Sequence, residues 1–263
     1  MFKWLTERRR KHLLETPFPD AWTTVLETEV AAYLLLDEGE QKHLRDLVQV
    51  FVAEKYWEGG ADFEITDEVK VVIGGSACQM LLGRDHDLFA RVGSIFVYPT
   101  TVMIPAQPVG VFTFPRGVVA PTAVLGEATH MGTVVLAWDA VKRDAQTAND
   151  GRNVVVHELA HQIDALDGSF DGTPPLDRPQ ARRWGQVFEA AFVEQKARSE
   201  RGEKSFLRDY AITNEAEYFA VASEVFFEQP GKLRDALPDV YAQLAEYYGL
   251  DLAARSRNIH AGS

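Results

Sequence analysis

The stretch VVVHELAHQIDALDG, residues Val154 to Gly168, constrains this chain of 263 residues more than any other feature. His157 and His161 are four positions apart, and Glu158 follows the first histidine directly. Valines precede the motif and apolar residues are interspersed with it, so the stretch predicts a largely buried helix. Helical residues at i and i+4 lie one turn apart on nearly the same face, so both imidazoles can reach one ion.

This histidine pair has two interpretations. Zinc binds two neutral imidazoles and an oxygen ligand and keeps one position for water. Glu158 can then act as the general base toward that water, whose pKa the metal lowers. In the alternative, the histidines are core residues with local hydrogen bonds. A buried helix with three polar side chains and no partner would leave costly unsatisfied groups, so we favour the zinc site.

A zinc site of this kind needs a third protein ligand, and Asp167 is the first candidate. It lies six residues after His161, where compact zinc peptidases place their third ligand. However, Asp164 stands where that pattern has the glycine that ends the helix, so Asp167 is disfavoured. Asp164 itself can accept a hydrogen bond from one imidazole, or it can simply be a polar residue at the helix end.

The second candidate is a glutamate of the segment YAITNEAEYFAVASE, which contains Glu215, Glu217 and Glu224. Glu217 and Glu224 are seven positions apart and share a helix face, and Tyr210 is seven positions before Glu217. We favour Glu217 as the ligand over a solvated helix residue, with Glu224 in a supporting or structural role. The Tyr210 hydroxyl could then donate a hydrogen bond to the oxyanion that develops when water attacks a carbonyl.

The first third of the chain reads as helical. Apolar spacings predict an amphipathic helix over residues 40 to 57, closed by Gly59 and Gly60. A second, more buried helix is predicted over residues 66 to 82, although Gly74 and Gly75 weaken that prediction. Between residues 94 and 138 the short runs IFVYP, TVMIP, GVFTF and TVVLAW predict the strands of a small sheet.

Helices return in the last part of the chain. Asn149 and Asp150 are expected to cap a helix that ends near residue 166, and three more are predicted over residues 180–199, 214–229 and 238–248. This order predicts an α+β fold with the sheet packed against the motif helix. Residues 1–90 are expected to form a helical N-terminal subdomain and residues 91–263 the catalytic domain, joined in one compact unit. The strand VVLAWD, residues 134–139, either pairs with an extended peptide or is a plain core strand.

The composition limits the classes of binding partner and the cellular compartments that we expect for this protein. A net charge of −12 argues against a nucleic-acid surface or a general binder of anionic membranes. Cys78 is the only cysteine, which excludes an intramolecular disulfide and a thiolate metal cluster. We expect no secretory signal and no membrane span, because no sufficiently long apolar run is present. These features together predict a soluble cytoplasmic protein.

The segments HELAHQIDALDG and DYAITNEAEYFAVASEVFFEQP resemble the Mlc titration factor A family of zinc metallopeptidases. The catalytic half of that family is similar to the C-terminal domain of anthrax lethal factor, and the resemblance covers most of the chain. It implies a zincin-like fold of the gluzincin type. It also implies zinc ligation by His157, His161 and Glu217, with Glu158 as general base and Tyr210 assisting at the transition state.

The resemblance further implies a peptide substrate, aminopeptidase activity and binding to the glucose-responsive repressor Mlc, as in enterobacterial members of the family. We therefore expect a zinc-dependent peptidase that acts through a metal-activated water and also regulates a transcriptional repressor by binding it. The alternative is a regulatory binding protein that sequesters an Mlc-like repressor and has a secondary or vestigial zinc site. Zinc hydrolysis of a non-peptide bond is a third hypothesis.

Overall fold

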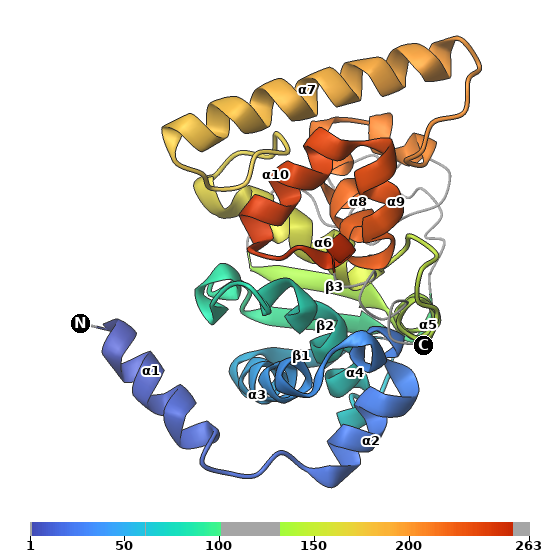
Figure 1. Cartoon of the computed structure of the whole chain (residues 1–263). Helices are drawn as coiled ribbons and strands as arrows, with labels where there is room; N and C mark the ends of the chain where they lie inside the picture. Colours follow the sequence, from blue (N-terminus) through green and yellow to red (C-terminus); the bar gives the residue numbers. More distant parts are fainter. Residues whose placement is uncertain (1, 61, 101–131, 255–263) are drawn as a thin grey trace, which may run out of the picture. The chain divides into compact units, whose positions relative to one another are not determined.

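The structure is a computed structural model that describes residues 2–60, 62–100 and 132–254 (Figure 1). Contacts divide the chain into two compact units, and each is discontinuous in the sequence. The first unit consists of Met1–Leu82 and Val92–Thr147, and the second of Gly83–Arg91 and Ala148–Ser263. The described elements are mostly helices with one small sheet, in agreement with the predicted α+β class. The predicted domain boundary near residue 90 stays a prediction.

The sheet belongs to the first unit and contains β1 (Tyr56–Gly59), β2 (Ser94–Tyr98) and β3 (Thr133–Ala137). The strands run parallel in the order β1-β2-β3, and Ser94 of β2 is paired with Tyr56 and with Thr133. The strands predicted from IFVYP and TVVLAW are confirmed, while TVMIP and GVFTF lie outside the described residues. The sheet and the histidine motif belong to different units, so their predicted packing stays a prediction.

The helices of the first unit are α1 (Phe2–Leu13), α2 (Asp20–Glu29), α3 (Glu38–Glu54), α4 (Asp67–Cys78) and α5 (Trp138–Gln146). The two predicted helices correspond to α3 and α4, but the predicted end of the first one is wrong. It ends at Glu54, and Tyr56 and Trp57 belong to β1 instead. Aromatic residues favour strands, and pairing of Tyr56 with β2 outweighs the helical spacing of the preceding residues.

Close packing of α2 against α4 explains Gly75, the second of the two glycines that weaken the prediction of α4. A Cβ atom at Gly75 would lie 2.8 Å from Leu26 Cδ2 and 3.1 Å from Val30 Cγ2. Leu26 and Val30 are buried in the core of this unit. A glycine in a helix interior is intrinsically unfavourable, but here it allows the two helices to approach.

The helices of the second unit are α6 (Val154–Asp164), α7 (Arg178–Glu200), α8 (Glu215–Glu228), α9 (Pro230–Ala236) and α10 (Pro238–Tyr248). The predicted caps of α6 are wrong. Asn149 has a left-handed φ of 67°, and Asn153 is the N-cap, whose side chain accepts a hydrogen bond from Val156 N at 3.2 Å. Asn153 lies closer to the motif, so the helix is shorter than expected.

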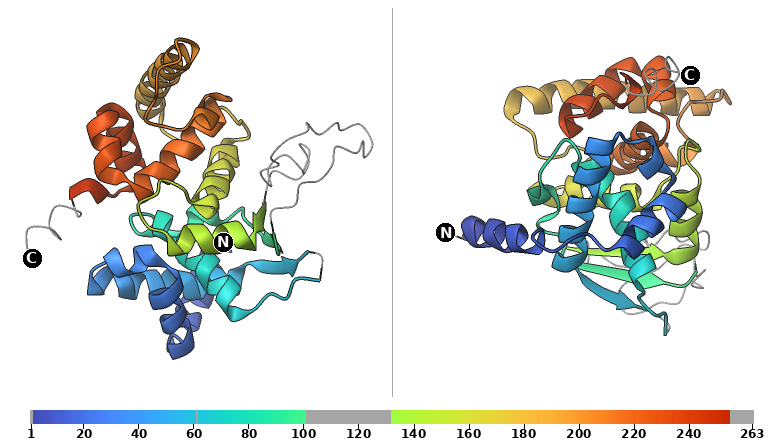
Figure 2. Two further views of the ribbon diagram at one scale, coloured as in Figure 1. Left: turned by 90° about the vertical axis from the view of Figure 1, so that its right-hand side faces the viewer. Right: turned by 60° about the horizontal axis from the view of Figure 1, so that its bottom comes forward.

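Helix α8 is the buried centre of the second unit and packs against α6, α7 and α10 (Figure 2). Trp184 of α7 is fully buried, stacks on Phe188 at 4.1 Å between ring centroids, and contacts Phe219 of α8 edge-on at 5.5 Å. These aromatic contacts fix α7 against α8. Over the parts of the chain that the structure describes, no helix is both long and apolar enough to cross a membrane.

The packing at Gly75 can be tested by Gly75→Val. The added side chain would collide with Leu26 and Val30. We therefore expect the variant to unfold at a lower denaturant concentration, with a free energy of unfolding about 1–3 kcal/mol below that of the wild type. Chemical denaturation followed by circular dichroism measures this. The control is Gly231→Val, because nothing lies within 4 Å of a Cβ at that position. Equal stability of the Gly75 and Gly231 variants would contradict the packing argument.

Candidate metal centre

His157 and His161 both lie on α6, one turn apart as the motif predicts. Their side chains are buried, with 5% and 7% of each residue exposed. The ring centroids are 4.8 Å apart, the rings are nearly perpendicular at 85°, and the two Nε2 atoms are 3.2 Å apart. The helix therefore presents two imidazole nitrogens of the same type toward one point.

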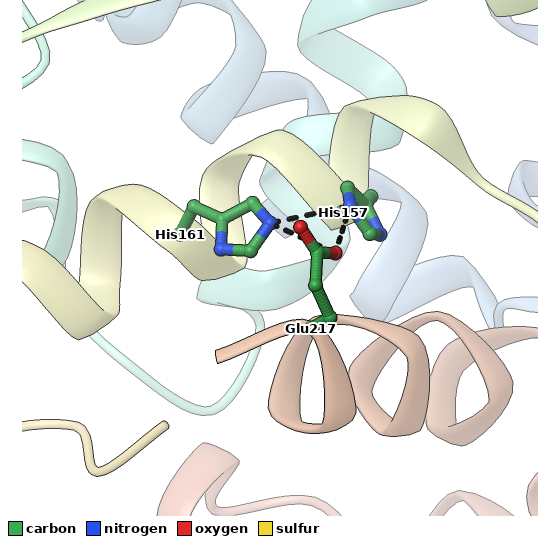
Figure 3. Close-up of side chains that lie close together, drawn as sticks. All are labelled: His157, His161 and Glu217. Carbon is green, nitrogen blue, oxygen red and sulfur yellow. Dashed lines mark hydrogen bonds and ion pairs between the residues drawn. The ribbon is translucent and has the colours of Figure 1, made fainter. Parts of the chain in front are cut away.

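Glu217 reaches this point from the first turn of α8 (Figure 3). The N-cap residue Asn214 accepts a hydrogen bond from Glu217 N at 2.9 Å, which fixes the start of the helix and the position of Glu217. Glu217 Oε2 lies 3.2 Å from His157 Nε2 and 3.4 Å from His161 Nε2. The structure thus brings together the three residues that we predicted as zinc ligands.

The three donor atoms fit a divalent cation. One nitrogen of each histidine and one carboxylate oxygen lie within 4.8 Å of one another, and all three residues are buried. Glu217 Oε2 is buried without a hydrogen-bond partner in the described structure. Burial raises the pKa of the Glu217 carboxyl, but the two imidazoles outweigh burial and hold it well below its usual range. A permanently ionised oxygen beside two imidazole nitrogens is a donor set that zinc prefers.

Glu224 orients His157 by contacting the ring nitrogen that faces away from Glu217. His157 Nδ1 donates a hydrogen bond to Glu224 Oε1 at 2.7 Å, which leaves Nε2 to face Glu217. Burial lowers the pKa of His157, but the carboxylates of Glu217 and Glu224 outweigh this effect and raise it to about 10. A hydrogen bond to the outer nitrogen fixes the tautomer and the ring plane of a metal-binding histidine. This geometry favours the supporting role that we considered for Glu224, which is to orient the His157 ring.

Arg208 and Asn153 hold Glu224 in place. Both guanidinium Nη atoms of Arg208 contact the carboxylate, Nη1 with Oε2 at 3.2 Å and Nη2 with Oε1. Asn153 N, at the start of α6, donates to the same Oε2 at 2.9 Å. The pKa of the Glu224 carboxyl is raised by burial and lowered more strongly by His157 and Arg208, so it stays ionised. The sequence reasoning missed Arg208, and its only signal was its position two residues before Tyr210.

Glu158 and Tyr210 lie beside this group. Glu158 follows His157 on α6 and is buried, and its charge raises the pKa of both His157 and Tyr210. Tyr210 lies in the short 3-10 helix Asp209–Ile212, with its ring centroid 5.9 Å from that of His157. Its side chain remains partly exposed, while burial and the Glu217 carboxylate raise its pKa above the usual value. Tyr210 therefore stays a hydrogen-bond donor at neutral pH.

The two aspartates that follow the motif have other contacts. Asp167 is exposed, and its carboxylate accepts hydrogen bonds from Ser169 N and Oγ at 2.9 and 2.7 Å. It is not among the three grouped donors. Asp164 Oδ2 accepts from Gly172 N at 3.0 Å, and Oδ1 is buried without a hydrogen-bond partner in the described structure. The predicted hydrogen bond from an imidazole to Asp164 is therefore absent from the described contacts, and Glu224 occupies that role.

Two histidines one turn apart, an intervening glutamate and a carboxylate from a second helix are the features of a metallopeptidase site. Comparison with known families agrees, because residues 4–249 match the sequence model of the glucose-regulated metallo-peptidase M90 family. The chain belongs to this family. Membership implies a divalent metal, for which the grouped histidines and Glu217 are the candidate ligands.

Three relatives show how far the similarity extends. The chain is 33% identical over 253 residues to the protein slr2042 of Synechocystis sp., covering 94% of this chain and 90% of the relative. It is 27% identical over 231 residues to Mlc titration factor A of Serratia proteamaculans, covering 86% of each. It is 35% identical over 134 residues to Mlc titration factor A of Edwardsiella ictaluri, covering 50% of this chain and 51% of the relative.

The ligand set can be tested by metal analysis of purified protein. We expect one equivalent of zinc in the wild type and its loss in His157→Ala and in Glu217→Ala, because each removes one of three donors. His12→Ala is the control, since His12 is exposed and its ring contacts Glu15. Stoichiometric zinc in either ligand variant would contradict the assignment, provided that circular dichroism shows a folded chain.

The support of His157 by Glu224 predicts a graded effect. Glu224→Gln removes the charge that holds His157 Nδ1, so we expect zinc affinity to fall about 10–100-fold without loss of the fold. Competition with a chelator measures the dissociation constant. Glu228→Gln is the matched control, because Glu228 is a buried carboxylate of the same helix that bonds Asn149 and Asn153. Equal losses of affinity in both variants would indicate a general structural effect.

Proposed function

We propose that this protein is a zinc-dependent peptidase in which His157, His161 and Glu217 hold the metal. The observation that carries the proposal is the convergence of these three buried donors in a chain of a metallo-peptidase family. A zincin-like fold of the gluzincin type accompanies this assignment, because the third ligand is a glutamate on a second helix. We further propose a cytoplasmic location, which the single buried cysteine, Cys78, supports.

Held by His157, His161 and Glu217, a zinc ion would supply Lewis acidity to a water molecule and to the substrate carbonyl. Glu158 accepts the proton of the attacking water and passes it to the leaving amine. Its position next to His157, and its electrostatic effect on both His157 and Tyr210, support this role. Glu158 is buried beside His157, so bulk water has little access to its carboxylate.

Tyr210 stabilises the oxyanion in this proposal. Its phenol lies beside the ring of His157, and its side chain is exposed enough for a substrate to reach it. Because its pKa is raised above the usual value, the hydroxyl carries its proton throughout the neutral range. A neutral donor beside a polarised carbonyl strengthens its hydrogen bond as negative charge develops on the oxygen.

Substitutions of these two residues separate metal binding from chemistry. We expect Glu158→Gln to keep one equivalent of zinc and to lose peptide hydrolysis, because glutamine cannot accept the proton. Tyr210→Phe should keep zinc and lower kcat about 10²–10³-fold, the range for loss of one oxyanion donor. Metal analysis and a peptide-amide assay on the same preparations measure both effects.

The control for this assay is Glu200→Gln, an exposed carboxylate at the end of α7. Full activity of the Glu158→Gln variant would refute its role as general base. Equal hydrolysis of N-terminally free and acetylated peptides would argue against an aminopeptidase. Hydrolysis of an ester or phosphate substrate in the absence of peptide cleavage would favour the non-peptide hypothesis.

Binding of an Mlc-like transcriptional repressor is a second candidate function, and the names of the Serratia and Edwardsiella relatives favour it. In this alternative the chain sequesters the repressor and the metal centre is secondary. The Glu158→Gln variant discriminates between the two functions. If it binds and titrates the repressor as the wild type does, binding does not require hydrolysis.

A further inference from the structure

The second unit contains a cavity of about 390 Å³ outside the metal centre. It is bounded by α7, by the start of α8 and by the loop of residues 171–173. Its apolar lining is aromatic and comes from Trp184, Phe188, Phe192 and Tyr218. The rings of Phe188 and Phe192 each meet Tyr218 edge-on, at 6.0 and 5.8 Å between centroids. Aromatic faces and edges in a cavity of this size can enclose one side chain or terminal residue.

Three carboxylates surround these rings, from Asp171, Glu189 and Glu215, and all three residues are exposed. No lysine or arginine is among the described residues that line the cavity. Within the described ranges, the carboxylates of Glu189 and Glu215 make no hydrogen bond or ion pair, and Asp171 accepts one from Thr173 N at 3.0 Å. No ion pair among the described residues therefore neutralises the carboxylates at this cavity.

Gly185 leaves the α7 side of the cavity unfilled. It lies inside the helix α7, where glycine is about 1 kcal/mol less favourable than alanine. Nothing lies within 4 Å of a Cβ placed at Gly185, so helix packing does not require the glycine. Gly185 lines the cavity, and a larger residue there would fill part of it. The absent side chain keeps the space open.

The loop of residues 171–173, which forms one wall of the cavity, is held in place by hydrogen bonds and close packing. Trp184 Nε1 donates to Gly172 O at 2.8 Å, and Gly172 N donates to Asp164 Oδ2. Gly172 has a φ of +74°, and a Cβ there would lie 2.4 Å from Glu215 O. The loop is thus held by α7 and α6 and pressed against α8. A preformed wall of this kind lowers the conformational cost of binding.

The cavity is close to the metal centre along both helices that build that centre. Glu215, at its rim, is two residues before the candidate ligand Glu217, which corresponds to about 3 Å along the axis of α8. Gly172, in its wall, is bonded to Asp164, which is three residues after His161. Side chains two positions apart point to nearly opposite sides of a helix, so a substrate that reaches both sites would have to pass around the first turn of α8.

We propose that this cavity binds a cationic group of the peptide substrate, an ammonium or a guanidinium. The carboxylates attract the charge, and the rings of Phe188, Phe192 and Tyr218 contact the cation and its aliphatic stem. The proposal rests on the proposed peptidase function and assigns a substrate class to it. The cation can be the N-terminal ammonium of the substrate or a lysine or arginine side chain.

Three small probes distinguish these sources without any hydrolysis. Norleucine amide carries only the α-ammonium, N-acetyl-lysine amide carries only the side-chain ammonium, and N-acetyl-norleucine amide is neutral. Calorimetric titration of the full-length zinc-loaded protein measures the dissociation constants. We expect at least one cationic probe to bind about 3–10-fold more tightly than the neutral probe, the range for a partly enclosed ion pair.

Three variants locate the binding. Glu189→Gln and Glu215→Gln each remove one carboxylate and should weaken the preferred cationic probe about 3–10-fold. Gly185→Leu should abolish binding of that probe by filling the cavity, and leucine is a better helix former than glycine. Glu200→Gln on α7 and Gly231→Leu on α9 are the matched controls, since a Cβ at Gly231 also meets nothing within 4 Å. The controls should bind like the wild type.

Preference for a cationic probe that is lost in the cavity variants and kept in the controls supports the proposal. Equal binding of all three probes, no binding of any probe, or wild-type binding in the cavity variants overturns it. Binding through the metal alone is recognised because it would survive Gly185→Leu. Cation binding without peptide hydrolysis would overturn the proposed function and leave the cavity assignment intact. Peptide hydrolysis without cation binding at the cavity would overturn the cavity assignment and leave the proposed function intact.

Discussion

The imidazole of His157 is held between two carboxylates of one helix, and the arrangement of the second unit depends on this contact. Glu217 lies at its Nε2 atom and Glu224 at its Nδ1 atom. The two glutamates are seven positions apart on α8, so both face α6. The pair fixes the register of α6 against α8, because a shift of either helix by one turn would remove the imidazole from both carboxylates.

Charge balance explains why such an acidic group can be buried. Glu158, Glu217 and Glu224 all lie in the interior, and burial of unpaired charges is strongly unfavourable. The guanidinium of Arg208 balances one of them. The pKa of His157, raised to about 10, shows that this environment favours additional positive charge. A divalent cation would supply that charge and leave both imidazoles neutral. Because the cation would relieve the unfavourable burial of the carboxylates, their burial favours metal binding.

The sequence predicted those features whose signals are local. The i, i+4 spacing placed both histidines on one helix, and the seven-residue spacing placed Glu217 and Glu224 on one face. Arg208 was not predicted, because its role depends on a contact with Glu224 that only the folded chain creates.

The same distinction applies to the fold. The helices α3, α4, α6, α7, α8 and α10 have apolar spacings that the sequence displays, whereas α1, α2, β1, α5 and α9 were not predicted as separate elements. The apolar run TVVLAW continues past the end of β3, and α5 begins at Trp138. Asp139 accepts a hydrogen bond from Ala140 N in that first turn. Four residues of β1 carry too little pattern to be recognised without their partner strand.

Asp164 connects the metal helix to the aromatic cavity and explains a departure from expectation. Its position suggested a hydrogen bond to an imidazole, but its Oδ2 atom holds Gly172 N instead. Burial raises the pKa of this carboxyl to about 6, so an ionised Asp164 is unfavourable for stability at neutral pH. The contact fixes the loop that forms the cavity wall relative to the last turn of α6.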